Sequence, residues 1–452
     1  MSPGRVVVVG GGLAGISAAL GCRDAGFDVT LLEARARLGG ATYSFRRGEL
    51  TVDTGQHVFL RCYSDYTALL RRLGTLDKVR IQPRFHVPVV TPAGESWTLR
   101  RSRLPAPAHL LPALIGHKAL SPRERFAAAR TALALRKLDP DDPSLDRTDF
   151  ASWLRSRGEP RRAVTALWEL FCTAALNAAP ENASLALAVK VFRTGMLDTA
   201  AGGDIGTIER PLSEVHGDPA REKLLEAGVR LFPRSKVLEV SGELGDYRVR
   251  TREGERNQEI TADAVVLAVP NAAAGKLLEQ RRTPEQPDWS GLSRAPIINV
   301  HVHFDRPVTR LPMAAALDSP VQWLFDRTAV ANAASGQYLV VSLSAAHDRV
   351  DTRSARLRAE YLPAMESLFP AAREAGVLDF FITREPAATF LPEPGTRRLR
   401  PSGRTGRPGL VLAGAWTDTG WPDTLEGAVR SGNTAARVVS RAIDSQRSVA
   451  WR

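Results

Sequence analysis

The chain has 452 residues, of which 44% are hydrophobic and 24% charged, a balance that excludes a fibrous or disordered protein. Its length predicts two or three domains. The formal net charge of +12 suits an anionic ligand or an anionic membrane surface, but no uninterrupted basic run or basic–aromatic interleaving indicates nucleic-acid binding.

Cysteine usage and hydropathy limit the compartment. Cys22, Cys62 and Cys172 lie far apart without a CxxC pair, so a zinc site is not expected and a reducing compartment fits. The chain begins without the charged and apolar regions of a secretory signal. No stretch approaches the ~20 apolar residues that span a bilayer. We expect a cytoplasmic protein that is soluble or bound to the inner face of the cell membrane.

The first predicted element is a buried parallel strand at Arg5–Val9, which ends in four consecutive valines. A glycine-rich turn and a predicted helix over residues 16–25 follow. In this turn the first glycine permits a sharp bend, the second lets the backbone approach a pyrophosphate, and the third allows close helix–strand packing. The residues assigned to the phosphates are Gly10, Gly12, Leu13, Ala14 and Gly15.

The next strand, over residues 29–32, ends at Glu33, where a carboxylate can accept hydrogen bonds from ribose hydroxyls. The stretch 34–41 that follows contains paired glycines and resembles the extended fingerprint of FAD-dependent oxidoreductases of the amine oxidase and carotenoid desaturase superfamily. The resemblance implies FAD as the cofactor. The contacts it implies in this stretch are Ala34, Arg35, Gly39, Gly40 and Ala41.

A short strand near residues 50–52 precedes the loop Asp53-Thr54-Gly55-Gln56-His57. In the superfamily the corresponding loop lies beside the isoalloxazine, so the resemblance assigns Gly55, Gln56 and His57 to the cofactor. His57 fits equally well a hydrogen-bonded loop histidine without a chemical role.

Residues 81–203 differ in character from the nucleotide-binding part. An apolar segment broken by prolines, residues 104–115, is preceded by Arg100, Arg101 and Arg103 and followed by Arg123 and Arg125. It could enter a membrane interface or form a helical hairpin over a substrate cavity, and both can hold. Helices are predicted over 126–138, where it is amphipathic, over 151–157 with Thr148 or Asp149 as the cap, and over 168–177.

The nucleotide domain is expected to resume with a helix over 212–227 and strands at 229–232, 236–240, 247–252 and 262–270. By the resemblance, the backbone of Val237 contacts the adenine. Strands over 297–304, 322–326 and 338–343 belong to a second domain. His301 and His303 would share one face of their strand, but no third ligand is visible, so they are interpreted as polar strand residues and no metal is expected.

Near the end, a strand over 410–414 leads to a helix that opens at Thr424 and runs through residue 436. Its N-terminus would face the flavin, with Gly414, Thr424 and Leu425 as contacts. The predicted fold is α/β: a Rossmann-like FAD-binding domain assembled from segments 1–80, 204–275 and 400–445. Segments 81–203 and 276–399 form an α+β substrate domain with a mixed sheet and a helical insert.

Over nearly its whole length the chain resembles hydroxysqualene dehydroxylases, also called squalene-associated FAD-dependent desaturases. The resemblance rests on residues 53–57, 168–177, 322–327, 416–420 and 425–432. It implies that an allylic C30 alcohol loses its hydroxyl and gains a hydride, giving squalene for hopanoid synthesis. Such a reaction needs a general acid, for which His57, Asp418 and Glu426 are candidates. Asp418 and Glu426 could instead cap the last helix.

Two positions depart from the superfamily. Ala415 stands where an acid is usual, which puts a flavin contact in doubt, and Asn299 stands on the strand where amine oxidases commonly carry a lysine. Asn299 argues against amine oxidation. Three alternatives stay open: a carotenoid-type desaturase or isomerase, a flavin amine oxidase, and a non-catalytic flavoprotein that binds isoprenoids.

Overall fold

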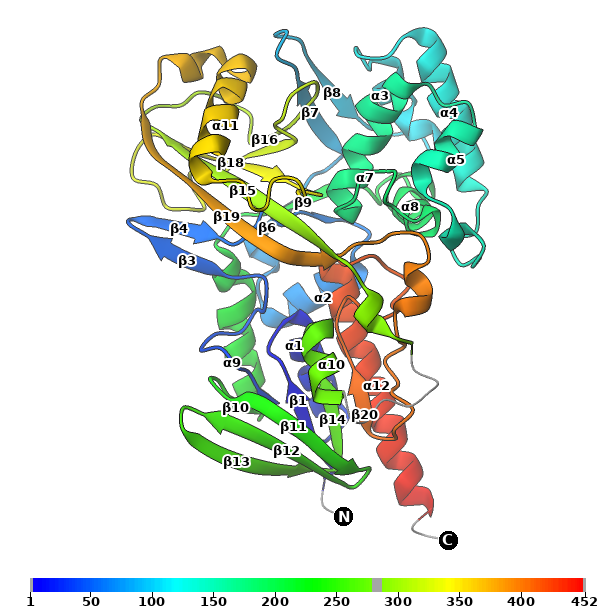
Figure 1. Ribbon diagram of the computed structural model, residues 1–452, viewed down its shortest axis with the longest axis vertical. Coiled ribbons are helices and arrows are strands. Elements are labelled where there is room, and N and C mark those ends of the chain that lie inside the picture. Colours follow the sequence, from blue (N-terminus) through cyan, green and yellow to red (C-terminus); the bar gives the residue numbers. More distant parts are fainter. Residues whose placement is uncertain (1–2, 279–286, 450–452) are drawn as a thin grey trace.

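The computed structural model describes residues 3–278 and 287–449 and shows two domains stacked along the long axis of the molecule (Figure 1). The lower domain is built on a parallel sheet and contains both ends of the chain. The upper domain combines a mixed sheet with a group of helices at one side. This is the α/β fold with a second α+β domain that the sequence predicted.

The parallel sheet has five strands in the order β10-β2-β1-β14-β20. They are β1 (Arg5–Val9), β2 (Asp28–Leu32), β10 (Arg230–Phe232), β14 (Ala264–Leu267) and β20 (Leu410–Leu412). The sheet is therefore assembled from three separated segments of the chain. Apart from the exposed Arg5 that begins β1, strands β1 and β14 are apolar and buried, as expected when helices cover both faces.

Four helices pack around this sheet or lie beside it: α1 (Leu13–Asp24), α2 (Ser64–Leu73), α9 (Asp218–Glu226) and α12 (Leu425–Val449). Helices α1 and α12 pack closely at Gly21: a Cβ at this position would lie only 2.8 Å from the Cβ of Ala436. The predicted helix over 212–227 is confirmed, with a π-helical turn at Ser213–Gly217 before α9.

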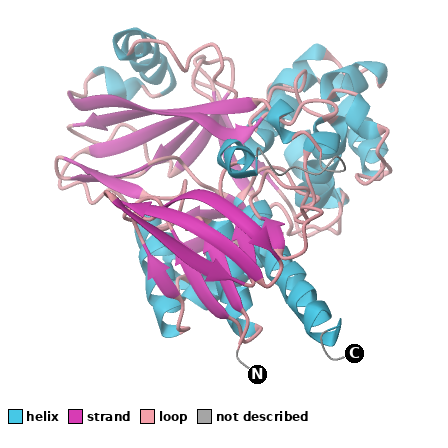
Figure 2. Cartoon of the chain, turned by 60° about the horizontal axis from the view of Figure 1, so that its bottom comes forward, coloured by secondary structure: helices cyan, strands magenta, loops and turns pink. Residues whose placement is uncertain are grey.

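A three-stranded antiparallel sheet covers one end of the parallel sheet and stands in front in Figure 2. It consists of β11 (Lys236–Glu243), β12 (Asp246–Glu253) and β13 (Arg256–Ala262). The pairing of β11 with β12 shifts between Val237 and Glu239, which leaves the backbone at Leu238 outside the ladder. Helix α10 (Asn271–Leu278) follows β14.

The sheet of the upper domain has seven strands in the order β19-β15-β18-β17-β16-β7-β8. They are β7 (His86–Val90), β8 (Ser96–Arg100), β15 (Arg294–Phe304), β16 (Met313–Ala316), β17 (Trp323–Asp326), β18 (Gln337–Leu343) and β19 (Val377–Phe390). Only the β16–β7 pair is parallel, so the sheet is mixed. Helix α11 (Ser354–Leu368) packs Leu357, Tyr361 and Met365 onto one face.

Short strands connect the two domains. The hairpin of β3 (Ser44–Arg47) and β4 (Leu50–Asp53) leads to a small sheet of β5 (Phe59–Leu60), β9 (Ile205–Ile208) and β6 (Val79–Ile81).

The helical insert, which we define as residues 104–197, contains α3 (Leu111–Ile115), α4 (Pro122–Arg136), α5 (Phe150–Ser156), α6 (Arg161–Ala163), α7 (Glu169–Leu176) and α8 (Leu185–Phe192). Of the two predicted caps, Thr148 and Asp149, it is Asp149 that caps α5, by accepting a hydrogen bond from the Ser152 N–H. Helix α7 continues α6 through a π-helical turn, so this helix begins before the expected residue 168.

Helix α4 differs from its prediction in two ways. It begins at Pro122 because Ser121 and Glu124 form a capping box, which the sequence reading overlooked. An amphipathic helix is expected to bury its large apolar residues, yet Phe126 is 73% and Leu133 51% exposed. That expectation is wrong for these two residues, which face away from the helices beneath.

Asp204 joins segments from both sides of the domain boundary. Its carboxylate is buried and accepts hydrogen bonds from Arg101 Nε at 2.6 Å, Arg61 Nε at 2.9 Å and the Phe85 N–H at 2.7 Å. Desolvation would raise the pKa of Asp204, but the donated hydrogen bonds outweigh it and hold the pKa below its ordinary value. The sequence did not indicate this anchor.

We expect Asp204→Asn to lower the free energy of unfolding by about 3 kcal/mol at neutral pH, because it breaks a buried ion pair. Since the pKa of Asp204 is depressed, its stabilisation is present above the ordinary pKa of 3.8 and is lost as the pH falls through the folded-state value. Denaturant titration measures both effects. Asp318→Asn, which breaks an exposed pair with Arg162, should cost less than about 1 kcal/mol. Equal losses in both variants would contradict the assignment.

Candidate functional site

The turn between β1 and α1 presents bare backbone at the carboxyl edge of the parallel sheet. A side chain on Gly10 would collide with the carbonyl of Ala268, and one on Gly15 with the carbonyl of Gly10. Gly12 faces open space, with Gly40 Cα the nearest atom at 3.7 Å from its absent Cβ. The N–H groups of Leu13 and Ala14, in the first turn of α1, have no intrahelical acceptor and suit an anion.

Glu33 follows β2 directly and lies against this turn, as predicted. Its Oε2 accepts a hydrogen bond from the Gly11 N–H at 2.6 Å, and its Oε1 accepts one from the Arg35 N–H at 2.7 Å. Each carboxylate oxygen keeps a second lone pair that a ribose hydroxyl can use. Ala34 and Arg35 are exposed beside it.

The loop after Arg35 folds back onto the glycine turn. The Gly39 N–H donates to the Gly11 carbonyl at 2.9 Å. Gly40 has φ +60° and would bring a Cβ to 2.9 Å from Gly12 Cα, so this approach requires glycine. Arg37 holds the loop, with its Nη1 donating to the Gly40 carbonyl at 3.0 Å and its guanidinium over the Tyr43 ring. The sequence reading missed Arg37.

Two further groups of predicted cofactor contacts lie next to the segment from Glu33 to Ala41, one at each end of it. The Ser235 N–H donates to the Glu33 carbonyl at 2.8 Å. This bond brings Val237 and the start of β11 near Glu33, the residue predicted to contact the ribose. Thr54 Oγ1 donates to the Ala41 carbonyl at 2.8 Å, which brings the loop of Gly55, Gln56 and His57 to the other end.

His57 is held in a defined tautomer. Its Nδ1 lies 3.2 Å from the Gly55 carbonyl, which can only accept, so Nδ1 carries the hydrogen. Burial lowers the pKa of His57 below its ordinary value, and Arg327 adds to the effect. The ring is neutral at neutral pH, and its free Nε2 is a proton acceptor rather than a donor.

The N-terminus of α12 closes the far end of the site. Gly432 touches α1, because a Cβ there would collide with the Ala14 carbonyl. The Gly414 N–H donates to Ser431 Oγ at 2.8 Å. From Gly432 back to Leu425 the helix rises about 10 Å. Leu425 therefore lies about two helical turns from the contact of α12 with α1.

The three candidates for general acid are not brought together. Glu426 is buried and accepts hydrogen bonds from the Tyr66 N–H at 2.8 Å and from Arg430 Nε at 2.7 Å, so it caps the first turn of α2. Asp418 is exposed and lines a polar pocket of about 230 Å³ with Asp65 and Arg437. The catalytic roles of these residues stay predictions.

Strand β15 contributes a polar group that the sequence reading considered only as a missing lysine. Asn299 Nδ2 donates to the Thr54 carbonyl at 3.3 Å, while its buried Oδ1 has no hydrogen-bond partner among the described residues. Thr383 lies between Asn299 Nδ2 (3.4 Å) and His301 Nε2 (2.9 Å). The second ring nitrogen of His301 is 2.7 Å from the Tyr338 hydroxyl.

The paired histidines of β15 thus have partners within the protein. His303 Nε2 lies 2.8 Å from the Ser335 carbonyl. Within residues 3–278 and 287–449, no group of three or more His, Cys, Asp or Glu side chains is arranged to hold a metal ion.

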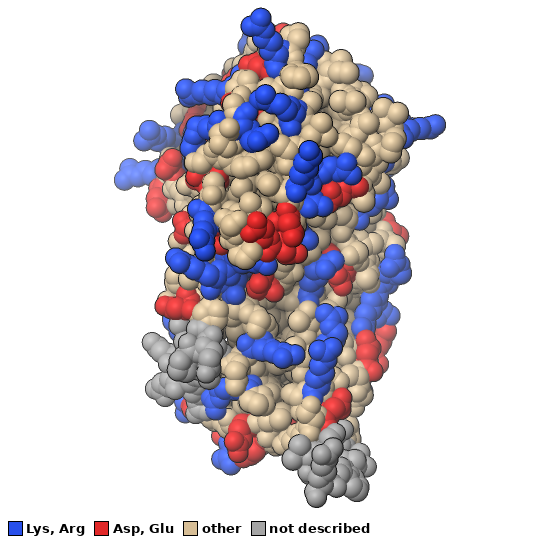
Figure 3. Space-filling view, turned by 90° about the vertical axis from the view of Figure 1, so that its right-hand side faces the viewer, with Lys and Arg blue, Asp and Glu red and all other residues tan. Residues whose placement is uncertain are grey.

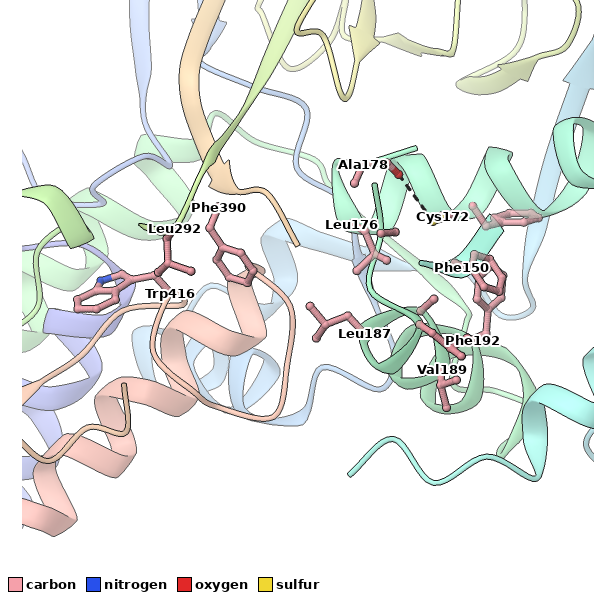
Figure 4. Packing of buried hydrophobic residues seen from close by; sticks show 14 of the residues in the cluster. Phe150, Cys172, Leu176, Ala178, Leu187, Val189, Phe192, Leu292, Phe390 and Trp416 are labelled. Carbon is pink, nitrogen blue, oxygen red and sulfur yellow. Dashed lines mark hydrogen bonds between the residues drawn. The ribbon is translucent and has the colours of Figure 1, made fainter. Parts of the chain in front are cut away.

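Apolar side chains extend from the N-terminus of α12 into the helical insert. Figure 4 shows Phe390 at the end of β19 grouped with Leu292 and Trp416, and Leu187 of α8 on the side facing them. Beyond Leu187 the same cluster continues through the helical insert, including Leu176, Phe150 and Phe192. All of these side chains are at most 9% exposed, so they form a packed apolar cluster beside α12, which we call the apolar wall.

Asp423 contacts the strand that carries Phe390, and it was not among the residues predicted from the sequence. Its Oδ2 accepts a hydrogen bond from the Phe390 N–H at 3.1 Å. Burial raises the pKa of Asp423 to about 6. The only sequence signal was an acid directly before the predicted start of the last helix.

These residues fit a flavin dinucleotide. Gly12 and Gly40 leave a cradle that a Cβ would fill, and the helix N-terminus beside it suits a pyrophosphate. The unpartnered Oδ1 of Asn299 provides an acceptor where the ring end of the ligand would lie.

Comparison with known proteins gives the same picture. Residues 13–440 match the family of flavin-containing amine oxidoreductases. The chain is 32% identical over 466 residues to a hydroxysqualene dehydroxylase of Sinorhizobium fredii, which covers 96% of this chain and 98% of the relative. It is 26% identical over 475 residues to a zeta-carotene desaturase of Synechocystis, with 96% and 97% covered. Cyclohexylamine oxidase from Brevibacterium oxydans shares the fold, with a TM-score of 0.70 at 18% identity over 98% of this chain and 100% of that one.

We expect Gly12→Ala to raise the dissociation constant for FAD at least 10-fold, about 1.4 kcal/mol, because the methyl group occupies the pyrophosphate cradle. The melting temperature of the apoprotein should change little, since the methyl group would meet only Gly40 Cα at 3.7 Å. Fluorescence titration with FAD measures the effect. Gly291→Ala, whose Cβ meets Leu399 at 3.4 Å outside the glycine turn, is the matched control. Equal FAD affinity in the two variants would contradict this geometry.

Proposed function

The chain belongs to the family of flavin-containing amine oxidoreductases, and on that premise we propose that it reductively removes the hydroxyl group of hydroxysqualene to give squalene for hopanoid synthesis. The family confirms the predicted enzyme class, an oxidoreductase with FAD as cofactor. The observation that carries the finer proposal is the apolar wall from Phe390 to the helical insert, which is supported by the 32% identity to a hydroxysqualene dehydroxylase.

In this reaction the chain orients a long isoprenoid and excludes water from it. Leu292, Phe390 and Trp416 provide the apolar surface next to α12, so an allylic carbon bound there is shielded from solvent. Bound FAD in its reduced form supplies the hydride. The N-terminus of α12 presents its partial positive charge to the ring end of the site, where it stabilises negative charge.

Amine oxidation is the less suitable reaction for these residues. Asn299 is neutral, and its side-chain amide donates hydrogen bonds to the Thr54 carbonyl and to Thr383 Oγ1. It therefore cannot act as the basic lysine that amine oxidases commonly carry there. The second candidate function is desaturation of a carotenoid-type polyene, favoured by the 26% identity to a zeta-carotene desaturase over 475 residues.

We expect the anaerobically reduced holoenzyme to convert hydroxysqualene to squalene, with one flavin reoxidised per squalene formed. Absorbance of the flavin and chromatography of the extracted lipids measure the two quantities together. Oxidised enzyme with phytoene should give no desaturated product. Flavin that stays reduced with hydroxysqualene, or desaturation of phytoene, would refute the proposed substrate.

We further propose that the helical insert contacts the cytoplasmic face of the membrane. Five large apolar side chains, which we call the apolar patch, are exposed on or next to α3 and α4. They are Leu104 (48%), Leu111 (44%), Ile115 (66%), Phe126 (73%) and Leu133 (51%). Within the described residues no helix is long and apolar enough to cross a membrane.

Basic side chains accompany the apolar patch. Arg100 and Arg103 precede Leu104 in the chain, and repulsion from both lowers the pKa of Arg84. None of the three forms an ion pair with a described carboxylate. In Figure 3, which views the molecule from this side, uncharged surface in the upper part is bordered by Lys and Arg side chains. Apolar insertion with basic flanks suits anionic lipids.

We expect Ile115→Ser combined with Phe126→Ser to weaken binding to vesicles of phosphatidylglycerol and phosphatidylcholine at least 10-fold, because burial of each large side chain contributes about 1.5–3 kcal/mol. Co-sedimentation measures the binding. Leu378→Ser, which removes a 56% exposed leucine from β19, should bind like the wild type. Vesicle binding that is equal in all three proteins, or absent in the wild type, would exclude this surface.

A further inference from the structure

Asp423 occupies a junction between the two ends of the proposed active site. It immediately precedes Thr424 and Leu425, where α12 begins and where the ring end of the dinucleotide is expected. Its carboxylate also reaches across to the end of β19, because Oδ2 accepts the hydrogen bond from the Phe390 N–H. The ring of Phe390 belongs to the apolar wall. This carboxyl group is therefore tied to the strand that carries Phe390 of the apolar wall.

The second oxygen of Asp423 is available to a ligand. Among the described residues no donor forms a hydrogen bond with Oδ1. Arg400 acts electrostatically on Asp423, but its Nη2 donates to the Ala415 and Thr417 carbonyls and its Nε to that of Trp416. Arg400 thus acts on Asp423 only through space. Arg400 also interacts electrostatically with Asp418, Asp146 and Arg397.

The surroundings of Asp423 favour its neutral form. Desolvation raises the pKa of the carboxyl to about 6, against the opposing effects of the Phe390 N–H and of Arg400. Lys190 and Arg430 lie over the neighbouring Trp421 ring, and neither forms an ion pair with Asp423 among the described residues. Arg430 pairs with Glu426 and Asp65 instead. Near pH 6 the group can both hold and release a proton, which general acid catalysis requires.

We propose that the carboxyl group of Asp423 is the acid that protonates the departing hydroxyl of the substrate. The assignment rests on the proposed dehydroxylation. It is independent of the three earlier candidates: His57 is a neutral acceptor, Asp418 is solvent-exposed, and Glu426 is committed to the cap of α2.

The step balances as follows. The proton of Asp423 forms a bond to the hydroxyl oxygen, and the carbon–oxygen bond breaks with both electrons going to oxygen, so that water leaves. The allylic cation accepts a hydride, one proton with two electrons, from the reduced flavin. The Asp423 carboxylate that remains is reprotonated from solvent.

The test compares single turnover of reduced holoenzyme in the wild type, Asp423→Asn and Asp423→Glu. Asparagine keeps an acceptor for the Phe390 N–H but cannot protonate a leaving group, so conversion of hydroxysqualene should fall about 10²-fold or more. Glutamate keeps the acid and should restore part of the rate. The wild-type rate should decline as the pH rises above about 6, where the carboxyl loses its proton.

A second substrate separates proton donation from a structural role. The allylic acetate of the same C30 skeleton leaves as a carboxylate and needs no proton, so Asp423→Asn should convert it at close to the wild-type rate. Infrared difference spectra of the resting protein provide a readout apart from turnover: a carboxylic acid that titrates near pH 6 should be present in the wild type and absent in Asp423→Asn. Asp318→Asn, at an exposed ion pair, controls for the loss of an aspartate.

The outcomes distinguish the two proposals. If the wild type fails to convert hydroxysqualene, the proposed function falls and the proton donor with it. If the wild type converts it and Asp423→Asn does so at the same rate with the same pH profile, only the assignment of Asp423 is wrong. Equal losses with the alcohol and the acetate would assign Asp423 a structural role and also overturn the proposal.

Discussion

The contact of three backbone segments around the first turn of α1 is the constraint on which the site depends. The β1–α1 turn, the loop that ends at Gly40 and the second turn of α12 meet at distances that leave no room for a Cβ on Gly15, Gly40 or Gly432. Each contact requires glycine, because any larger residue would push the segments apart. Segments from the two ends of the chain are thereby fixed around one ligand.

This contact separates two chemical environments: polar backbone groups at the phosphate end of the site and apolar side chains at the ring end. At the phosphate end the donors are backbone N–H groups, supplemented by the carboxylate of Glu33. At the ring end the surface is largely apolar, and the polar groups there are few, notably Asn299 and Asp423. A low-dielectric surface strengthens the effect of each of these groups on a bound ligand. Under the proposed function, the first environment would bind the charged dinucleotide and the second the apolar substrate.

Local patterns made the nucleotide-binding part predictable. A four-valine strand, a glycine turn and an acid at the end of the next strand are contained in the first 33 residues, and each confirmed element needs only its own neighbours to form. The strands β7, β8, β16 and β19 escaped prediction because their pairing partners lie far away in the chain. The exposure of Phe126 and Leu133 was hidden for the same reason, since periodicity does not reveal which face of a helix is covered.

The roles of the polar residues in the site likewise depend on contacts with distant parts of the chain, which the local sequence does not reveal. Glu426 looked like a catalytic acid, but it caps a helix that begins more than 350 residues earlier. Asp423 passed unnoticed because its burial depends on Phe390, at the end of another strand. One measurement tests the central claim most directly: a crystal structure of the protein with FAD. The pyrophosphate should lie on the N–H groups of Leu13 and Ala14, with the isoalloxazine at Thr424 and Leu425. An isoalloxazine directed away from α12, or a pyrophosphate off the glycine turn, would contradict it.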